Sequence, residues 1–257
     1  MPEGDTIHRA AASLAAALAG REITRFEAPR LRAREAPRPG ETVEDVAARG
    51  KHLLMRFSGG LTLHTHMRMS GSWHLYRPGE RWRKPRGAMV AAVETARVHA
   101  VCFSAPVVEM QDDRALARHA VLASLGPDLC VEGVDLEAVM SRLEALPAST
   151  EIGVALLDQT VAAGVGNVYR SEVAWACRLD PFRPLHTVDP GDRRGLYETA
   201  SRMLRANLAT ARRTTVPGGL AVYDRAGRAC PRCGTSIATR RQGEQARSVW
   251  WCTGCQR

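Results

Sequence analysis

The chain has 257 residues, and its 36 lysines and arginines outnumber its 27 aspartates and glutamates, which gives a formal charge of +9. A hydrophobic content of 45% with 25% charged residues is ordinary for a globular protein and excludes wholesale disorder. The length fits one large or two modest domains. The basic excess favours a polyanionic partner, and apart from Lys51 and Lys84 every basic side chain is an arginine.

The sequence holds no apolar run near the ~20 residues that a membrane span requires. Its early stretch over residues 10–19 is alanine-rich and amphipathic, unlike the apolar core of a signal peptide. We therefore expect a cytoplasmic protein without membrane contacts, associated with the nucleoid if it is bacterial. Thiols stay reduced in that compartment, so paired cysteines favour a metal over disulfides.

Short periodic segments fill the first half of the chain. Apolar residues recur every three or four positions over residues 6–19, which predicts a helix that Gly20 ends. A basic loop over residues 77–86 carries Trp82, which we expect to be exposed. Many short strands separated by turns predict a β-sandwich or barrel, with a hairpin turn at residues 58–60. The alternating runs cover residues 42–47, 52–57, 61–67, 73–76, 89–94 and 98–103.

Helical periodicity dominates after residue 126. Prolines between the third and fourth helical segments separate them, and a Gly/Pro stretch over residues 217–219 leads into a cysteine-rich tail. The expected order is therefore a helix, an all-β unit, a helical unit and a metal-binding tail. The predicted helices cover residues 134–146, 152–161, 168–177 and 193–211.

The tail contains two CxxC pairs with 18 residues between them. Four thiolates at this spacing are typical of a zinc site, and because protein ligands fill all four positions the metal is structural. A redox dithiol is the alternative, but it favours a βαβ context that is missing here. The expected ligands are Cys230, Cys233, Cys252 and Cys255.

Three arginines lie in the segment between the two pairs, which is suited to a β-hairpin: Arg240, Arg241 and Arg247. They predict a finger that faces DNA, and a solvated basic hairpin is the alternative. Upstream, two helices flank a turn with Gly164 and Gly166, and Asn167 begins the second helix. The free amides of a helix N-terminus suit a phosphate, although Asn167 could equally be a plain helix cap.

The amino terminus is the third feature of chemical interest. Removal of Met1 exposes a secondary amine on Pro2. A terminal amine titrates near ~8, so a useful fraction is deprotonated and nucleophilic at neutral pH. Such an amine can attack a sugar carbon and form an imine, as lysines do in other enzymes.

Together these segments resemble the Fpg/Nei family of bifunctional DNA glycosylases, and specifically its Nei, or endonuclease VIII-like, branch. The resemblance runs over essentially the whole chain. It implies an α+β multidomain fold with an N-terminal β-sandwich and its leading helix over residues 1–125, a helix–two-turn–helix domain over 126–229 and a zinc-finger β-hairpin over 230–257. It rests on Pro2-Glu3-Gly4, Gly50-Lys51-His52, the segment from Leu156 to Tyr169, Val222-Tyr223 and the four-cysteine finger with Arg247.

The resemblance also implies roles for single residues. Pro2 is the nucleophile that displaces the damaged base and forms a Schiff base, and Glu3 is the general acid and base that assists opening of the sugar ring. Lys51 contacts the phosphate or sugar at the lesion, where a compact charge is suitable. Asn167 and Arg247 grip phosphates beside the lesion, which helps to kink the duplex and extrude the nucleotide.

Other positions are carried over from the same resemblance. In the loop over residues 66–71, Met69 is the expected wedge in the space left by the extruded nucleotide, and Arg68 meets the orphaned base. Core packing of Met69 is the alternative. Tyr169 is expected among the DNA-binding residues. Asp5-Thr6 replaces the Pro-Glu that often follows the family's start, which leaves one supporting carboxylate in question.

Two absences favour the Nei branch over Fpg. The Arg and Phe that Fpg enzymes place after a DPRRF-like run are absent, because residues 109–114 are Glu-Met-Gln-Asp-Asp-Arg instead. The region near residue 217, where Fpg carries a lesion-capping loop, is also short. We therefore predict a monomeric base-excision-repair glycosylase and AP lyase that removes oxidised bases, chiefly pyrimidines, from damaged DNA by β,δ-elimination. It has one structural Zn²⁺ and no small-molecule cofactor. The alternatives are purine (8-oxoguanine) specificity, a non-catalytic damaged-DNA-binding homologue, and a zinc-ribbon module, which leaves the first 125 residues unexplained.

Overall fold

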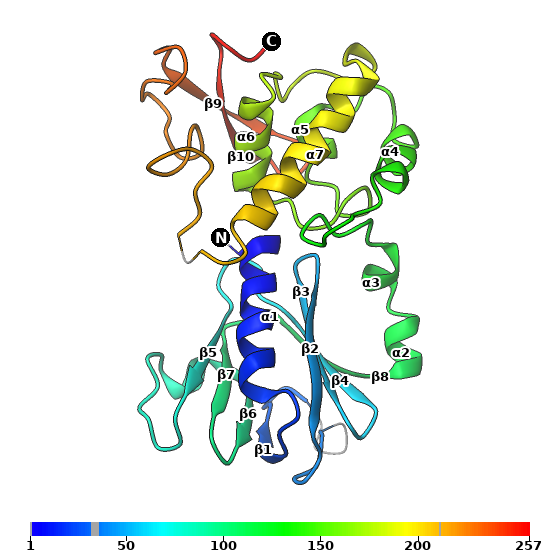
Figure 1. Ribbon diagram of the computed structural model, residues 1–257, viewed down its shortest axis with the longest axis vertical. Coiled ribbons are helices and arrows are strands. Elements are labelled where there is room, and N and C mark those ends of the chain that lie inside the picture. The colour runs from blue at the N-terminus through cyan, green and yellow to red at the C-terminus, as the bar shows by residue number, and fades with distance from the viewer. Residues whose placement is uncertain (1, 32–35, 211) are drawn as a thin grey trace. The chain divides into compact units, whose positions relative to one another are not determined.

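The computed structural model describes residues 2–31, 36–210 and 212–257 (Figure 1). The chain forms two compact units, Met1–Ser124 and Leu125–Arg257. The cysteine-rich hairpin, expected as a separate domain from residue 230, is part of the second unit. Among the described residues, no helix combines the length and the apolar character needed to cross a bilayer.

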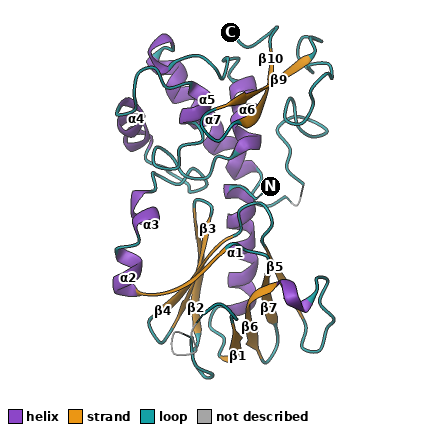
Figure 2. Ribbon diagram, turned by 180° about the vertical axis from the view of Figure 1, so that it is seen from behind, coloured by secondary structure: helices purple, strands orange, loops and turns teal. Residues whose placement is uncertain are grey.

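The first unit contains two four-stranded antiparallel sheets, which confirms the expected β-sandwich (Figure 2). Their strand orders are β1-β6-β7-β5 and β2-β3-β4-β8, and residues 58–60 form the expected turn between β3 and β4. The structure adds β1 and β8 to the six expected strands. The strands are β1 (Ile23–Glu27), β2 (Val43–Arg49), β3 (His52–Phe57), β4 (Leu61–His66), β5 (Ser72–Tyr76), β6 (Met89–Thr95), β7 (His99–Phe103) and β8 (Val107–Asp112).

Helix α1 (Gly4–Leu18) packs its apolar face into the core of the sandwich. It begins at Gly4, earlier than the expected residue 6, because Glu3 already serves as its N-cap. Ile7, Leu14 and Leu18 are at most 2% exposed, and burial of each such side chain stabilises the fold by about 2 kcal/mol. Two short helices, α2 (Asp113–Ala117) and α3 (Ala120–Ser124), end the unit.

The second unit is helical up to its C-terminal hairpin. Its helices surround one hydrophobic core: α4 (Leu136–Glu144), α5 (Ile152–Ala155), α6 (Asn167–Ala176) and α7 (Pro190–Ala206). The helix expected over residues 152–161 is wrong in length. It ends at Ala155, and Asp158 Oδ1 then accepts the amide of Thr160 at 2.8 Å, a local bond that competes with helix. Pro190 begins α7, where its missing N–H leaves no helical bond unmade.

Strands β9 (Ile237–Gln242) and β10 (Arg247–Cys252) form the antiparallel hairpin that the cysteine spacing predicts. Its inner residues, among them Ile237 and Cys252, share a small core with Trp175 of α6. The hairpin is therefore packed on α6, within the second unit.

Candidate functional site

The start of the chain is held at the first turn of α1. Glu3 is fully buried (0% exposed), and Pro2 is half-buried. The amides of Thr6 and Ile7 donate to the Glu3 carbonyl at 3.0 and 3.1 Å, which fixes Glu3 as the N-cap. Asp5 is also buried, and its Oδ1 accepts the Thr6 amide at 2.7 Å. The first turn thus contains a second buried carboxylate, at the point where the sequence departs from the family's usual start.

Lys51 lies in the turn between β2 and β3, at one end of the β2-β3-β4-β8 sheet. His52, the first residue of β3, pairs with His66, the last residue of β4, so Lys51 shares one sheet end with the loop that follows β4. Gly50 precedes Lys51 with φ 59°, a conformation that glycine adopts without strain. Both ribbon views place the N-terminus of α1 at this same end of the first unit (Figures 1 and 2). The start of α1, the turn that carries Lys51 and the loop after β4 therefore lie at the same end of the first unit.

The loop between β4 and β5 presents Met69 to solvent. Met69 is 76% exposed, which excludes the alternative of core packing. Arg68 adopts φ 43°, and its amide donates to His66 Nδ1 at 3.2 Å. Ser70 Oγ donates to the Ser104 carbonyl at 2.9 Å. An exposed apolar side chain on a loop with anchored ends has the geometry that a wedge requires.

The histidines beside Lys51 are neutral at neutral pH. Burial lowers the pKa of His66 to about 4, and the charges of Arg68 and Lys51 act in the same direction. Burial, with a smaller contribution from His66, lowers the pKa of His52 to about 3. The positive charge near this end of the sheet therefore comes from Lys51 and Arg68 and not from the imidazoles.

In the second unit, Asn167 is the first residue of α6, as expected. It does not cap the helix, because the N-cap is Gly166 and no side-chain cap bond forms there. Asn167 is 5% exposed, and its Nδ2 donates to the carbonyl of Ser248 on β10 at 2.9 Å. At this position the feature that suits a phosphate is the backbone N-terminus of α6.

Tyr169 is placed differently from the sequence-based expectation. It is fully buried (0% exposed) in the hydrophobic core of the second unit, where it lies among apolar residues such as Val165 and Val173. The guanidinium of Arg213 lies over its ring at 4.9 Å. Its side chain therefore packs the core and lacks the exposed surface that a contact with DNA needs.

The four predicted cysteine ligands come together. All four sulfurs lie within 4.8 Å of one another, with 3.9 Å between Cys230 Sγ and Cys255 Sγ and 3.4 Å between Cys233 Sγ and Cys252 Sγ. A tetrahedral ion with zinc–sulfur bonds of about 2.3 Å separates its sulfurs by about 3.8 Å. Trp175 Nε1 also donates to Cys230 Sγ at 3.3 Å, a contact that suits a thiolate. The cluster fits a tetrahedral metal ion.

The hairpin arginines are exposed, as expected for a nucleic-acid surface. Arg247 is the first residue of β10 and pairs with Gln242 at the end of β9. Arg240 and Arg241 lie on β9, and the Arg240 guanidinium lies 3.5 Å from the centre of the Phe182 ring. Within the described part of the chain, none of the three arginines forms an ion pair.

Two buried charged residues on α6 were missed by the sequence analysis. Arg170 is 0% exposed and donates to Gln242 Oε1 at 3.2 Å and to the Ser248 carbonyl at 2.7 Å. Glu172 is also 0% exposed, and its carboxylate accepts the amides of residues 221–223, each at 2.8 Å. The sequence did carry a signal for them, because two charged residues lie in a helix with apolar residues on both sides. Charged side chains that are buried in this way need partners, so the pattern indicates buried ion or hydrogen-bond contacts.

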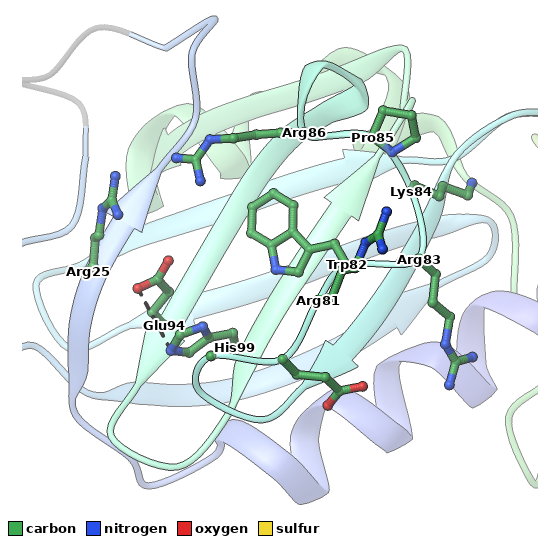
Figure 3. A pocket seen from close by; sticks show the side chains of 11 residues that line it. Arg25, Arg81, Trp82, Arg83, Lys84, Pro85, Arg86, Glu94 and His99 are labelled. Atoms are coloured by element: carbon green, nitrogen blue, oxygen red, sulfur yellow. Dashed lines mark ion pairs between the residues drawn. The ribbon is translucent and has the colours of Figure 1, made fainter.

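The basic loop over residues 77–86 borders an open hollow of about 770 Å³ in the first unit (Figure 3). Trp82, expected to be exposed, is half-buried, because it packs with Tyr76 and Phe103 on the sheet face opposite the sandwich core. Arg81 and Arg83 flank it, are exposed and, among the described residues, form no ion pair. The loop is therefore a second basic surface outside the predicted site.

The chain matches the formamidopyrimidine-DNA glycosylase N-terminal domain over residues 1–119 and the formamidopyrimidine-DNA glycosylase H2TH domain over residues 125–217. A probable endonuclease 8 2 of Streptomyces coelicolor is 42% identical over 265 residues, which cover 100% of this chain and 94% of the relative. The DNA-(apurinic or apyrimidinic site) lyase Nei2 of Mycolicibacterium smegmatis is 37% identical, with 100% of this chain and 99% of the relative covered. The structure of Lactococcus lactis Fpg in complex with abasic-site DNA superposes with a TM-score of 0.82 at 20% identity, over 100% of both chains.

Proposed function

The chain belongs to the formamidopyrimidine-DNA glycosylase (Fpg/Nei) family, in its Nei branch, and we propose that it is a base-excision-repair DNA glycosylase with AP lyase activity. Full-length relatives named endonuclease 8 and AP lyase support this. The observation that carries it is the group at one end of the first unit. There a buried Glu3 directly follows Pro2, and the turn that bears Lys51 lies at the same end.

In the proposed reaction, the amine that Pro2 exposes after removal of Met1 attacks C1′ of the damaged nucleoside. The bond from C1′ to the base breaks, and the base leaves with that electron pair and gains a proton. The proline nitrogen then loses its proton, the ring oxygen is protonated by Glu3, and the sugar opens to an iminium. Because the iminium acidifies C2′, β- and δ-elimination expel the two flanking phosphates in turn.

The DNA contacts are proposed to come from both units. Met69 and Arg68 occupy the space left by the extruded nucleotide, and Lys51 contacts the phosphate or sugar at the lesion. In the second unit, the N-terminus of α6 and the exposed Arg247 hold flanking phosphates. Since arginine–phosphate contacts release counterions, the affinity for DNA is expected to fall steeply as salt rises.

The metal of the four-cysteine site is proposed to be one Zn²⁺. The all-thiolate donor set and the sulfur separations suit zinc, and Cys230, Cys233, Cys252 and Cys255 would hold it. With four protein ligands it leaves no position for a substrate, so its contribution is to hold the hairpin that bears Arg247. We propose that the enzyme acts as a cytoplasmic monomer and needs no small-molecule cofactor.

Oxidised pyrimidines are the proposed substrates. The endonuclease 8 relatives and the absence of the DPRRF-like run favour them over 8-oxoguanine. The comparison that tests this uses matched duplexes with thymine glycol or with 8-oxoguanine opposite cytosine. Faster excision of 8-oxoguanine would assign the chain Fpg-like specificity instead.

Borohydride trapping on a thymine glycol duplex tests the mechanism. The mature protein is expected to form a covalent adduct, while Pro2→Gly and a form that retains Met1 are expected to lose it. An adduct on an abasic site but not on thymine glycol would keep the mechanism and reject the substrate. No adduct on either duplex would identify a non-catalytic DNA-binding homologue.

A further inference from the structure

A second group of metal-ligating side chains lies in the first unit, apart from the four cysteines. His64 on β4 stands directly opposite Glu109 on β8 in the sheet register. His119 comes from the connection between α2 and α3. Three different segments of the fold therefore bring two imidazoles and one carboxylate to one place.

The distances between the three groups match those of ligands around one metal ion. Glu109 Oε2 lies 3.0 Å from His64 Nδ1 and 3.0 Å from His119 Nε2, and the three ligand atoms all lie within 4.8 Å of one another. A metal ion with bonds of about 2.0–2.1 Å separates neighbouring ligand atoms by about 3 to 3.4 Å. No large movement of the backbone is needed for all three atoms to reach one ion.

From this geometry we propose that His64, Glu109 and His119 form a second binding site for a divalent transition-metal ion, of which Zn²⁺ is the representative. Two imidazole nitrogens and one carboxylate oxygen are donors that zinc accepts and that calcium and magnesium do not favour. Three protein ligands leave at least one position for water, in contrast to the closed four-cysteine site.

The surroundings support the ligands in the way that metal sites require. His64 Nε2 lies 2.8 Å from His52 Nδ1. A ligating histidine donates its other N–H to an acceptor that fixes its tautomer, and the neutral His52 nitrogen can take that place here. The His64 side chain is 2% exposed and that of His119 is 16% exposed, whereas that of Glu109 is 42% exposed. The site is therefore closed on the sheet side and open to entry of an ion from solvent.

The same groups also form a satisfied hydrogen-bond chain without a metal, which is the alternative that the test must separate. In that chain both imidazoles donate to Glu109, and His119 Nδ1 accepts the Leu122 amide at 3.3 Å. Metal binding at His119 Nε2 moves its proton to Nδ1 and gives up this long bond. Binding at His64 Nδ1 moves its proton to Nε2, which then donates to His52 Nδ1, and the proton of His52 Nδ1 moves to its own Nε2.

The test measures zinc stoichiometry and affinity on the full chain. The wild type, first loaded with one equivalent at the cysteine site, is titrated with Zn²⁺ against a chromophoric chelator, and bound metal is counted by elemental analysis. A second equivalent is expected for the wild type. Glu109→Gln keeps the size of the side chain and one oxygen acceptor but removes the negative charge. It is therefore expected to lower the affinity for the second equivalent of zinc at least tenfold. His119→Gln is expected to do the same.

His99→Gln is the matched control, because His99 also faces a glutamate, Glu94, at 3.8 Å, but the residues that the structure describes add no third ligand there. It is expected to keep the second equivalent. Zinc is also expected to raise the melting temperature of the wild type more than that of Glu109→Gln. One equivalent in the wild type, or a second one bound equally by Glu109→Gln, overturns the proposal. Since no readout is enzymatic, its failure is separate from that of the proposed function.

Discussion

The side-chain amide of Asn167 donates a 2.9 Å hydrogen bond to the carbonyl of Ser248, which ties the first turn of α6 to the start of β10. Arg170 donates to the same carbonyl at 2.7 Å, and Asn167 Oδ1 accepts a bond from Arg170. Because Arg247 directly precedes Ser248, these bonds fix the backbone from which its guanidinium extends. Asn167 is thus a positioning residue for the hairpin in this structure.

Asn167→Ala is therefore expected to destabilise the fold. It removes one bond to Ser248 and one acceptor of Arg170, so the free energy of unfolding should fall by about 1–2 kcal/mol. Arg247→Ala removes an exposed side chain, so stability should change by less than about 0.5 kcal/mol. Urea denaturation measures both effects.

Arg247→Ala also tests the direct contact with DNA. Arg247→Ala should lower the affinity for an abasic-analogue duplex and reduce the slope of log K against log salt by about 1. Fluorescence anisotropy at several salt concentrations measures this. Arg194→Ala is the control, because this arginine of α7 is held by Glu137 and Glu198. Equal loss in both arginine variants would contradict a specific role for Arg247.

Glu172→Gln should be among the most destabilising conservative changes in the second unit. The carboxylate is fully buried and accepts the amides of residues 221–223 as well as Thr215 Oγ1. A glutamine turns an NH₂ group toward amides that also donate, and each unsatisfied buried donor costs about 1–3 kcal/mol. We expect a loss of about 3 kcal/mol in urea denaturation. Glu198→Gln, an exposed change on α7, should stay within about 0.5 kcal/mol.

The elements that could be predicted from sequence are those whose burial is periodic. Helix α1 buries one stripe, and β3 ends where the turn residues 58–60 require. Strand β8 was missed because Val107 to Gln111 are all half-buried, so its burial does not alternate. The segment 152–161 has helical periodicity, yet side-chain bonds of Asp158 and Gln159 to nearby backbone hold a loop there.

In the candidate site, too, some features could be predicted from the sequence and others could not. The four cysteines come together as their spacing predicts. The roles given to the start of the chain, Lys51 and Met69 come from local motifs and stay predictions. Contacts between residues that lie far apart in the chain could not be predicted in this way. The bond from Asn167 joins positions 81 residues apart, and the opposition of His64 and Glu109 depends on strand register, which pairs residues 45 positions apart. Burial of Tyr169 likewise follows from packing and not from its motif.

Loss of the metal proposed for the four-cysteine site should unfold the hairpin. Cys230 and Cys252 share a small core with Trp175, so freeing the sulfurs opens that core. Cys233→Ser should bind one zinc fewer, melt at a lower temperature and lose affinity for DNA. Cys177→Ser is the control, since this thiol lies on α6's C-cap outside the cluster. Elemental analysis and tryptophan fluorescence check both variants, and an unchanged zinc count in Cys233→Ser would reject the assignment of the site.

Cys102 is expected to lower the free energy of unfolding as the pH rises above 9. It lies in the sandwich core at 0% exposure, and burial raises the pKa of its thiol from 9.0 to about 12. Between these values the folded state retains a proton that the unfolded state releases. The contribution of the buried, protonated Cys102 thiol to the free energy of unfolding is therefore fully present below pH 9. It is lost as the pH rises toward 12.

The measurement compares the wild type with Cys102→Ala by urea denaturation at several pH values. The alanine variant lacks the titrating group, and all other groups are common to both proteins. Relative to the variant, the wild type should lose about 1.4 kcal/mol per pH unit above the unfolded pKa and nothing below it. The folded thiol should also resist alkylation at pH 8, because so little thiolate is present. A stability difference that stays constant across this range would show that Cys102 is not desolvated in the folded protein.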